Sequence, residues 1–437
     1  MIRALFGRLD RRSRFGADVA MLTAGGLSAQ VVVIAASPVL SRLYEPEEIA
    51  ILGLLATIVS MGSPILCGRY DVALLMPRSR DAAERLLGIA LRFTVAIAAI
   101  AFLTSLIAGD RIALALDAPT PRGWILLVAP ALLLTGVGIA LSGMASRLRR
   151  FAVIARARFA QSTVAVVLNL SLGALGAGPI GLLSAYLAGL LASASMLAHR
   201  QPGSIATVLR WDLRSTTLMR RYRSYPLVNA SSGLLHGVTL ALPMLVLAAH
   251  FPIALVGQFA LLMRVATLPL NALSDAVSRV HLRRVVDLVA SGESIRGHLV
   301  KVMMLMAAFA AIPTLVLTLH ASTLFAWVFG ESWRPAGEFL QIMMPAIAVR
   351  FVVGSISTTF GGTSNNGLVM IWRLVALAVT STVLAWGAAT HDPSSFFRYF
   401  AMSEIALYAL MLGFAWRAAG HPRSTSRPRP SRPEGSS

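Results

Sequence analysis

The stretch "LCGRYDVALLMPRS" (Leu66–Ser79) follows about twenty apolar residues and places an Arg-Tyr-Asp triplet at the end of an otherwise uncharged run. A run of that length crosses the hydrocarbon core of a bilayer, about 30 Å thick, as one helix. If the span begins near Glu47, the triplet lies just beyond the membrane core and does not interrupt it. Tyr70 then suits the interfacial aromatic belt, and Asp71 can pair with Arg69 or with a group elsewhere in the fold. The alternative role of the triplet is a purely structural anchor at the interface.

The composition of the whole chain is that of a membrane protein. Of 437 residues, 56% are hydrophobic and only 13% are charged, and the mean hydropathy is +0.72. Soluble domains carry about 25% charged residues, so an ordinary soluble enzyme is excluded. The apolar runs are long and apolar on every face, which favours helices over the short alternating strands of a barrel. We therefore predict an all-α polytopic membrane protein.

Hydropathy predicts twelve transmembrane helices. They are 17–38, 47–68, 86–108, 123–145, 152–174, 179–198, 227–249, 254–277, 298–319, 336–357, 367–389 and 395–416. The longest polar connection falls after the sixth span and divides the chain into two six-helix lobes. The predicted organisation is a basic N-terminus (1–16), a first lobe (17–198), a linker (199–226), a second lobe (227–416) and a disordered basic tail (417–437).

The basic residues predict the orientation of these spans. The chain has a formal net charge of +20, and its 39 basic residues include a single lysine, Lys301. With the N-terminus inside, 31 of them, Arg373 included, fall in segments on the cytoplasmic side, and five fall in loops on the other side. The charge therefore reports topology, and we expect no nucleic-acid partner. We expect cytoplasmic termini and an uncleaved first helix, although its arginines and "IAAS" stretch loosely resemble a signal peptide.

A weak internal repeat supports the division into two lobes. The segment "LYEPEEIAILGLLATI" (Leu43–Ile58) resembles "HFPIALVGQFALLMRV" (His250–Val265), each with a proline, a small residue and then a span. Together with the six-plus-six topology, this predicts two pseudo-symmetric bundles. In transporters of that design, the substrate site lies between the repeats.

Three arginines fall inside predicted spans: Arg92, Arg264 and Arg350. An arginine at the middle of a membrane helix costs roughly 2.5 to 3.5 kcal/mol, so we expect these side chains to face water or an anion. Arg92 lies nearer a span edge and could instead extend its side chain to the interface. A cavity with net positive charge suits an anionic substrate. The acidic residues in or near spans are Asp18, Asp71, Asp275 and Glu404, of which Asp275 lies four residues before Arg279 and can pair with it.

Several stretches resemble the bacterial polysaccharide flippases, the lipid-linked oligosaccharide (O-antigen) branch of the multidrug, oligosaccharidyl-lipid and polysaccharide exporter superfamily. The resemblance lies in "SRLYEPEEIAILGLL" and "GRYDVALLMPRS", and later in "YPLVNASSGLLHGVTLALPMLVL", "GQFALLMRVATLPLNAL" and "PAIAVRFVVGSIST". Two positions depart from the family pattern: Ala50 stands at a usual glycine, and Asp71 replaces the commoner glutamate. The resemblance implies a V-shaped, twelve-helix fold in the bacterial inner membrane and a substrate of undecaprenyl diphosphate carrying a sugar unit.

On this basis the predicted function is that of a flippase for surface polysaccharide biosynthesis, including lipopolysaccharide O-antigen. The predicted substrate contacts are Arg264 and Arg350, with Arg92 and Arg69 at the entrance, and the gate or ion-pair residues are Asp71, Tyr70 and Asp275. We expect no catalytic residue, metal or cofactor. The expected partners are the lipid-linked oligosaccharide and membrane lipids, with a polysaccharide polymerase and a chain-length regulator as candidates.

Three other functions stay open at this stage. A cation-coupled exporter of small amphipathic molecules would need a carboxylate deep in the first lobe, where Asp18 is the nearest. A membrane glycan enzyme would normally present a large outer loop, and every predicted outer loop is short. A non-transporting subunit of a glycan-assembly complex is the third.

Overall fold

The computed structural model of the chain describes residues 26, 28–115, 122–199, 213–363 and 366–420, and every regular element in these residues is helical. Ten segments of the described chain are long and apolar enough to cross a membrane. Two shorter apolar helices, Ser28–Leu43 and Ile253–Thr267, lie where the first and eighth spans are predicted. The all-α membrane fold is therefore confirmed, and the predicted twelve helices correspond to ten clear spans and these two shorter ones.

The elements follow one another with short connections. After the helix Ser28–Leu43 they are α2 Pro46–Leu66, α3 Tyr70–Ala73, α4 Arg80–Ala115, the 3₁₀ helix Arg122–Leu127, α5 Val128–Arg147, α6 Phe151–Ala174, α7 Gly178–His199, α9 Leu213–Arg221, the π-helical turn Tyr225–Ala230, α10 Ser231–His250, α11 Ile253–Ser291, α12 Arg296–Phe329, the 3₁₀ turn Glu331–Trp333, α13 Arg334–Ser355, α14 Thr359–Gly362, α15 Asn366–Ala389 and α16 Pro393–Gly420. With 39 residues, α11 is about 58 Å long and extends beyond a hydrocarbon core of about 30 Å.

Local sequence signals set several helix starts. At α2, Glu45 and Glu48 form a reciprocal capping box, and Pro46 occupies the first helical turn, where its missing N–H is no loss. At α16, the carboxylate of Asp392 accepts hydrogen bonds from the backbone N–H groups of Ser394 and Ser395. Both starts lie at the same end of the molecule.

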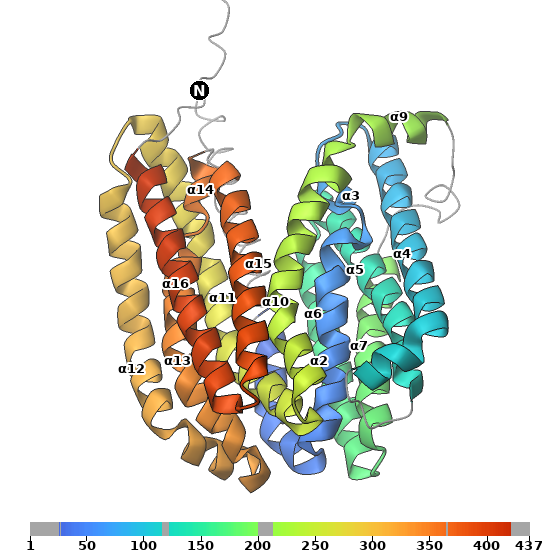
Figure 1. The fold of residues 1–437 in the computed structure, drawn as a ribbon. Coiled ribbons are helices and arrows are strands. Elements are labelled where there is room, and N and C mark those ends of the chain that lie inside the picture. Colours follow the sequence, from blue (N-terminus) through green and yellow to red (C-terminus); the bar gives the residue numbers. More distant parts are fainter. Residues whose placement is uncertain (1–25, 27, 116–121, 200–212, 364–365, 421–437) are drawn as a thin grey trace, which may run out of the picture.

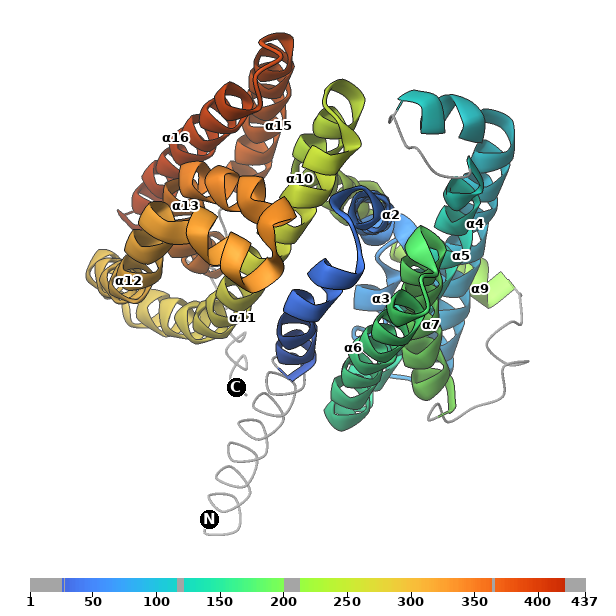
Figure 2. The same ribbon diagram turned by 90° about the horizontal axis from the view of Figure 1, so that it is seen from below.

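The helices form two groups, which we call the first lobe (residues 28–199) and the second lobe (residues 231–420). Figure 1 shows α3, α9 and α14 at one end of the molecule, which we call the arginine-rich end, and the start of α2 at the opposite end. Seen from below in Figure 2, α2 and α10 lie side by side between the two groups. In the predicted linker, α9 packs against α4, and residues 200–212 lie outside the described chain. The predicted domain boundaries stay a prediction.

The apolar core is shared by the lobes at the opposite end only. One cluster of buried side chains combines both lobes, among them Leu40, Leu54, Trp124, Leu247, Val256, Phe325, Trp333 and Phe397. Toward the arginine-rich end, the core separates into one cluster in the second lobe and another in the first. The buried apolar cores of the two lobes therefore merge at one end and are separate at the other.

Direct contacts between backbone and side chains join the lobes at the opposite end. The indole N–H of Trp333 donates to the backbone oxygen of Ser41 at 2.9 Å, and the hydroxyl of Ser41 donates to the backbone oxygen of Phe329 at 3.0 Å. Gly257 lies directly against the backbone of Pro46, with no room for a side chain. Because Pro46 and Gly257 belong to the two echoing segments of the sequence, the repeat packs on itself here.

Nearer the arginine-rich end, α10 approaches α2 closely along two glycines. A Cβ at Gly233 would lie 2.7 Å from the Cβ of Pro64, and one at Gly237 would lie 2.9 Å from the backbone oxygen of Met61. Small residues at such positions let two membrane helices bring their backbones together. This contact joins the first lobe to the first helix of the second.

Candidate functional site

A cavity of about 950 Å³ lies between the lobes. Its walls come from α2 and α7 of the first lobe and from α10, α11, α13 and α16 of the second. A cavity of this size can hold a sizeable polar headgroup or a small molecule. The residues that line it include both apolar and polar side chains of these helices.

The cavity contains three charged side chains: Arg264 on α11, Arg350 on α13 and Glu404 on α16. A nitrogen of Arg350 lies 3.5 Å from a carboxylate oxygen of Glu404. Within the described part of the chain, no ion pair involves Arg264. The cavity therefore carries a net positive charge, and the two arginines predicted as substrate contacts face the same space.

Neutral polar groups surround these charges. They include Thr57, Ser60, Tyr186, His236, Thr239, Thr267, Ser274, Ser278, Ser357, Thr358 and Tyr408. Toward the arginine-rich end, the hydroxyl of Ser278 donates to the backbone oxygen of Ser355 at 2.9 Å, and that of Thr358 donates to the backbone oxygen of Ser278 at 3.2 Å. These bonds fix α11 against the end of α13, so this wall of the cavity is held in place.

The structure does not bring Arg92 to this site. Arg92 lies on α4, which packs against α5 and α9 and contributes no residue to the lining. The side chain of Asp275 lies outside the described part of the chain, so its predicted pairing with Arg279 stays a prediction. Of the predicted contacts inside spans, the cavity unites only Arg264 and Arg350.

In the Arg-Tyr-Asp triplet, Arg69 ends the turn after α2, and Tyr70 and Asp71 begin α3. Tyr70 is only 1% exposed and packs on Phe93, with ring centroids 5.5 Å apart, so it lies in the core of the first lobe and not in an interfacial belt. Burial raises the pKa of Asp71, while the nearby charge of Arg69 lowers it. The charge of Arg69 therefore acts on Asp71, and the predicted ion pair between the two stays a prediction.

Arg69 and Arg373 both reach the start of α10. Nη2 of Arg69 lies 3.7 Å from the position that a Cβ on Gly233 would occupy. From α15, Nη1 of Arg373 donates to the backbone oxygen of Ser232 at 3.0 Å and also to its hydroxyl. Arg69 of the first lobe and Arg373 of the second thus lie beside adjacent residues of one helix.

Sequence reasoning missed Glu404 and Arg373 as site residues. Glu404 stands out as one of few acids in a span, but nothing in the sequence shows that it pairs with Arg350. Arg373 lies within the span predicted at 367–389, yet its nearness to the span edge placed it with the cytoplasmic segments. A search for every charge within a predicted span would have found both.

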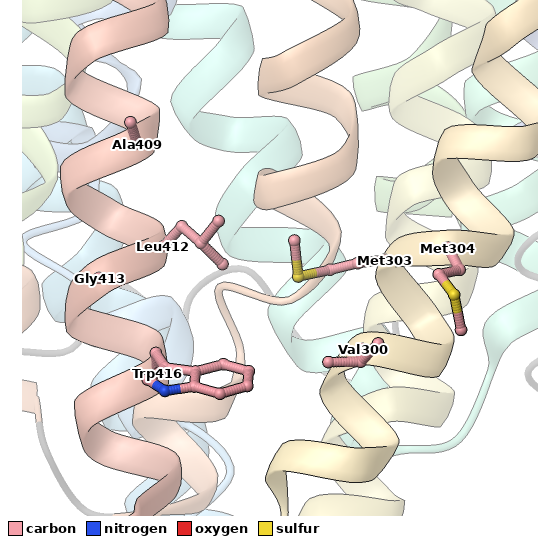
Figure 3. Close-up of a pocket in the computed structure, with 7 residues that line it drawn as sticks. All are labelled: Val300, Met303, Met304, Ala409, Leu412, Gly413 and Trp416. Atoms are coloured by element: carbon pink, nitrogen blue, oxygen red, sulfur yellow. The ribbon is translucent and has the colours of Figure 1, made fainter.

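A second depression lies on the outside of the second lobe, between α12 and α16 (Figure 3). It measures about 530 Å³, and its lining residues are Val300, Met303, Met304, Ala409, Leu412, Gly413 and Trp416. Arg296 lies over the Trp416 ring, 5.1 Å from its centroid. The depression has no charged lining group and faces away from the other lobe, so it is not part of the candidate site. Among the residues that the structure describes, no group of three or more His, Cys, Asp or Glu could hold a metal ion.

Comparison with known proteins identifies related sequences and folds. A family model described as polysaccharide biosynthesis protein matches residues 39–338. No curated protein matches the chain in sequence. The lipid II flippase MurJ, in an inward closed conformation, has a TM-score of 0.71 at 11% identity, over 92% of this chain and 87% of that chain.

Two transporters of the MOP superfamily show the same fold in different conformations. An inward-facing multidrug resistance MATE family transporter has a TM-score of 0.70 at 15% identity, over 93% of this chain and all (100%) of that chain. An outward-facing one has a TM-score of 0.57 at 14% identity, over 92% of this chain and 94% of that chain. At such identities these structures establish the fold alone.

Proposed function

Because this chain belongs to the polysaccharide biosynthesis protein family, we propose that it is a flippase for surface polysaccharide assembly. It moves oligosaccharide units linked to undecaprenyl diphosphate across the bacterial inner membrane by alternating access. The arginine-rich end faces the cytoplasm, in keeping with the excess of arginine expected on that side of short loops. The polyprenyl tail of the substrate stays in lipid while its headgroup enters the cavity.

The observation that carries this proposal is that Arg264 and Arg350 line one cavity between the lobes. An arginine stays charged and presents a planar fork of donors that fits phosphate oxygens. The diphosphate bridges the two guanidinium groups, and the sugars meet the hydroxyl and imidazole groups around them. Glu404 neutralises Arg350 in the absence of substrate and competes with the diphosphate for it.

The closed opposite end supports a substrate that enters from the arginine-rich end. The shared apolar core and the bonds between Ser41 and Trp333 close the cavity on the other side. The fold is also more similar to the inward-facing MATE family transporter than to the outward-facing one. Transport then requires the lobes to separate at Ser41 and Trp333 and to approach each other at the arginine-rich end.

The proposal is tested by complementation of a flippase-null strain with Arg264→Ala and Arg350→Ala. Each substitution should reduce surface glycan by more than about tenfold, because one charge-assisted contact to phosphate contributes roughly 1.5 to 3 kcal/mol. Immunoblotting of membranes shows that the variants are present. Arg398→Ala is the matched control, since Arg398 is an exposed arginine at the opposite end. Full glycan production by both cavity variants would refute the proposed site.

Glu404 favours one second candidate, a cation-coupled exporter of small amphipathic molecules. A buried carboxylate in the cavity could carry the coupling cation, although the described lining residues from the first lobe contain no acid. Glu404→Gln separates the two functions. In a flippase the substitution only removes a competitor for Arg350, so complementation persists, whereas in a cation-coupled exporter transport is lost.

A further inference from the structure

Arg69 and Arg373 lie together at the start of α10, and the acidic groups around them do not neutralise both positive charges. Arg69 lies near enough for its charge to act on Arg373 across the lobes. The acidic group that Arg69 faces is Asp71, whereas Arg373 is held by the neutral Ser232. Both arginines are half-buried, so water screens their repulsion only in part. An anion placed between them would relieve it.

The backbone turn before α3 aims Arg69 at this point. Gly68 and Arg69 both have positive φ, at 53° and 58°. The left-handed conformation costs a residue with a side chain about 1 to 2 kcal/mol, so the surrounding fold imposes it. On α10, the place that a Cβ of Gly233 would take lies 3.7 Å from Nη2 of Arg69, an ordinary contact distance. The turn thus places the charge at the contact between the lobes.

The pair of arginines lies next to the cavity. Ser232, the hydrogen-bond partner of Arg373, lies one turn before His236 on α10, and His236 lines the cavity that holds Arg264 and Arg350. Positive groups therefore lead from the arginine-rich mouth between the lobes to the centre. An anionic headgroup that enters there meets Arg69 and Arg373 before it meets the cavity arginines.

We propose that Arg69 and Arg373 form a second phosphate-binding site, separate from Arg264 and Arg350, where the diphosphate of the lipid-linked substrate docks before it enters the cavity. This assignment rests on the proposed function, from which it takes its substrate. The site is divided between the lobes, so it exists only while the arginine-rich ends are in the arrangement seen here. The site recognises the charge of the phosphate groups and does not distinguish one sugar from another.

The test measures binding of farnesyl diphosphate to the purified full-length protein in nanodiscs. The variant Arg264→Gln with Arg350→Gln should bind more weakly than wild type but retain a residual site. Adding Arg69→Gln or Arg373→Gln to it should weaken this residual binding a further tenfold or more, because each removes a charge-assisted contact (roughly a factor of ten per 1.4 kcal/mol). Arg398→Gln, added to the same variant, is the control and should change nothing.

Each outcome separates the two proposals. If the double cavity variant binds like wild type, the proposed function fails. If that variant loses affinity but the added Arg69→Gln and Arg373→Gln substitutions have no effect, only the second site fails. Arg69→Gln breaks no hydrogen bond of the described chain, so its effect reports the loss of charge even if Arg373→Gln loses its bonds to Ser232.

Competition identifies the source of the phosphate. Inorganic diphosphate should displace the residual farnesyl diphosphate, because the site binds phosphate oxygens. Failure to displace it would overturn the proposal. Phosphatidylglycerol added to neutral nanodiscs should compete much less, since it has one phosphate and one negative charge. Equal competition by phosphatidylglycerol would show a general lipid-headgroup contact and would overturn the assignment to the substrate.

Discussion

The two ends of the contact between the lobes are built from opposite chemistry. At the opposite end, Ser41, Trp333 and the backbone of Pro46 and Gly257 are packed without intervening charge. At the arginine-rich end, the apolar cores of the lobes are separate, and Arg69 and Arg373 repel each other. One end is stabilised by close packing and by hydrogen bonds between neutral groups, and the other carries a charge that an anion can neutralise.

This difference indicates which end responds to ligand. Apolar close packing does not depend on an anion, so the contact at the opposite end is stable in the empty protein. The repulsion at the arginine-rich end decreases when an anion binds, so substrate favours approach of the lobes there. If the lobes move as rigid bodies, that approach opens the packed end, and binding is thereby coupled to release on the other side.

Gly257→Ala should have the largest effect on the packed end. A Cβ at this position would overlap the backbone of Pro46, and neither main chain can move away without separating the lobes. We expect a loss of roughly 1 to 3 kcal/mol in the free energy of unfolding and a marked loss of glycan export. Thermal unfolding in detergent and complementation measure the two effects.

Gly297→Ala is the matched control for that substitution. Gly297 lies on α12, and a Cβ there would meet nothing within 4 Å. Because alanine is the better helix former, this variant should be as stable as wild type or slightly more stable. Equal stability of the two alanine variants would contradict the role of Gly257.

Much of the fold could be predicted from the sequence because lipid imposes a simple rule on each span. The apolar runs locate the helices, and the positions of arginine predict their direction. Hydropathy reports where a helix contacts lipid and not where it ends, so the prediction of 254–277 covers only part of α11, Ile253–Ser291. The echo between Leu43–Ile58 and His250–Val265 hinted at the packed end, but only the structure shows that these segments touch.

Trp333→Phe should have an intermediate effect on the packed end. The substitution removes the indole N–H that bonds to the backbone oxygen of Ser41, while most of the aromatic packing is kept. We expect a loss of about 1 kcal/mol in the free energy of unfolding, measured by thermal unfolding in detergent. Trp327→Phe on α12 is the control, because Trp327 is 77% exposed and faces outward. A larger loss for Trp327→Phe would contradict this account.

The smallest expected effect on stability comes from a pair of histidines at the arginine-rich end. Nε2 of His281 lies 2.8 Å from the hydroxyl of Thr359, which donates to the backbone oxygen of Ile356, so His281 donates to Thr359. Its Nδ1 lies 3.2 Å from Nε2 of His298 and accepts from it. Burial and, secondarily, the charge of His298 lower the pKa of His281 to about 4. Of the charged groups around the pair, Arg284 and Lys301 both act on His298.

Stability should therefore fall as the pH falls from about 6.5 to about 4. The unfolded chain binds a proton at His281 near pH 6.5. The folded protein resists that proton down to about pH 4, so unfolding takes up a proton within this window. Thermal unfolding across the window should show a decline in Tm that is smaller in His281→Gln. His250→Gln, a change at an exposed histidine of the opposite end, should leave the decline intact.

The candidate site could be predicted only in part. Arg264 and Arg350 were identified because a charge inside lipid requires a wet or charged partner. The same rule also selected Arg92, which lies on α4. The rule does not show whether a helix faces the other lobe, and α4 contributes no residue to the cavity. The roles of Glu404 and Arg373 depend on contacts between helices distant in the chain, which a single sequence does not report.

The close approach of Gly233 and Gly237 to α2 has a mechanical consequence. Two backbones in contact have no interlocked side chains that must change rotamer when the helices rotate. We therefore expect the line between α2 and α10 to be the hinge if the two lobes tilt relative to each other. A bulky side chain at Gly233 or Gly237 should hinder this tilting and slow the proposed transport, although neither position belongs to the proposed substrate site.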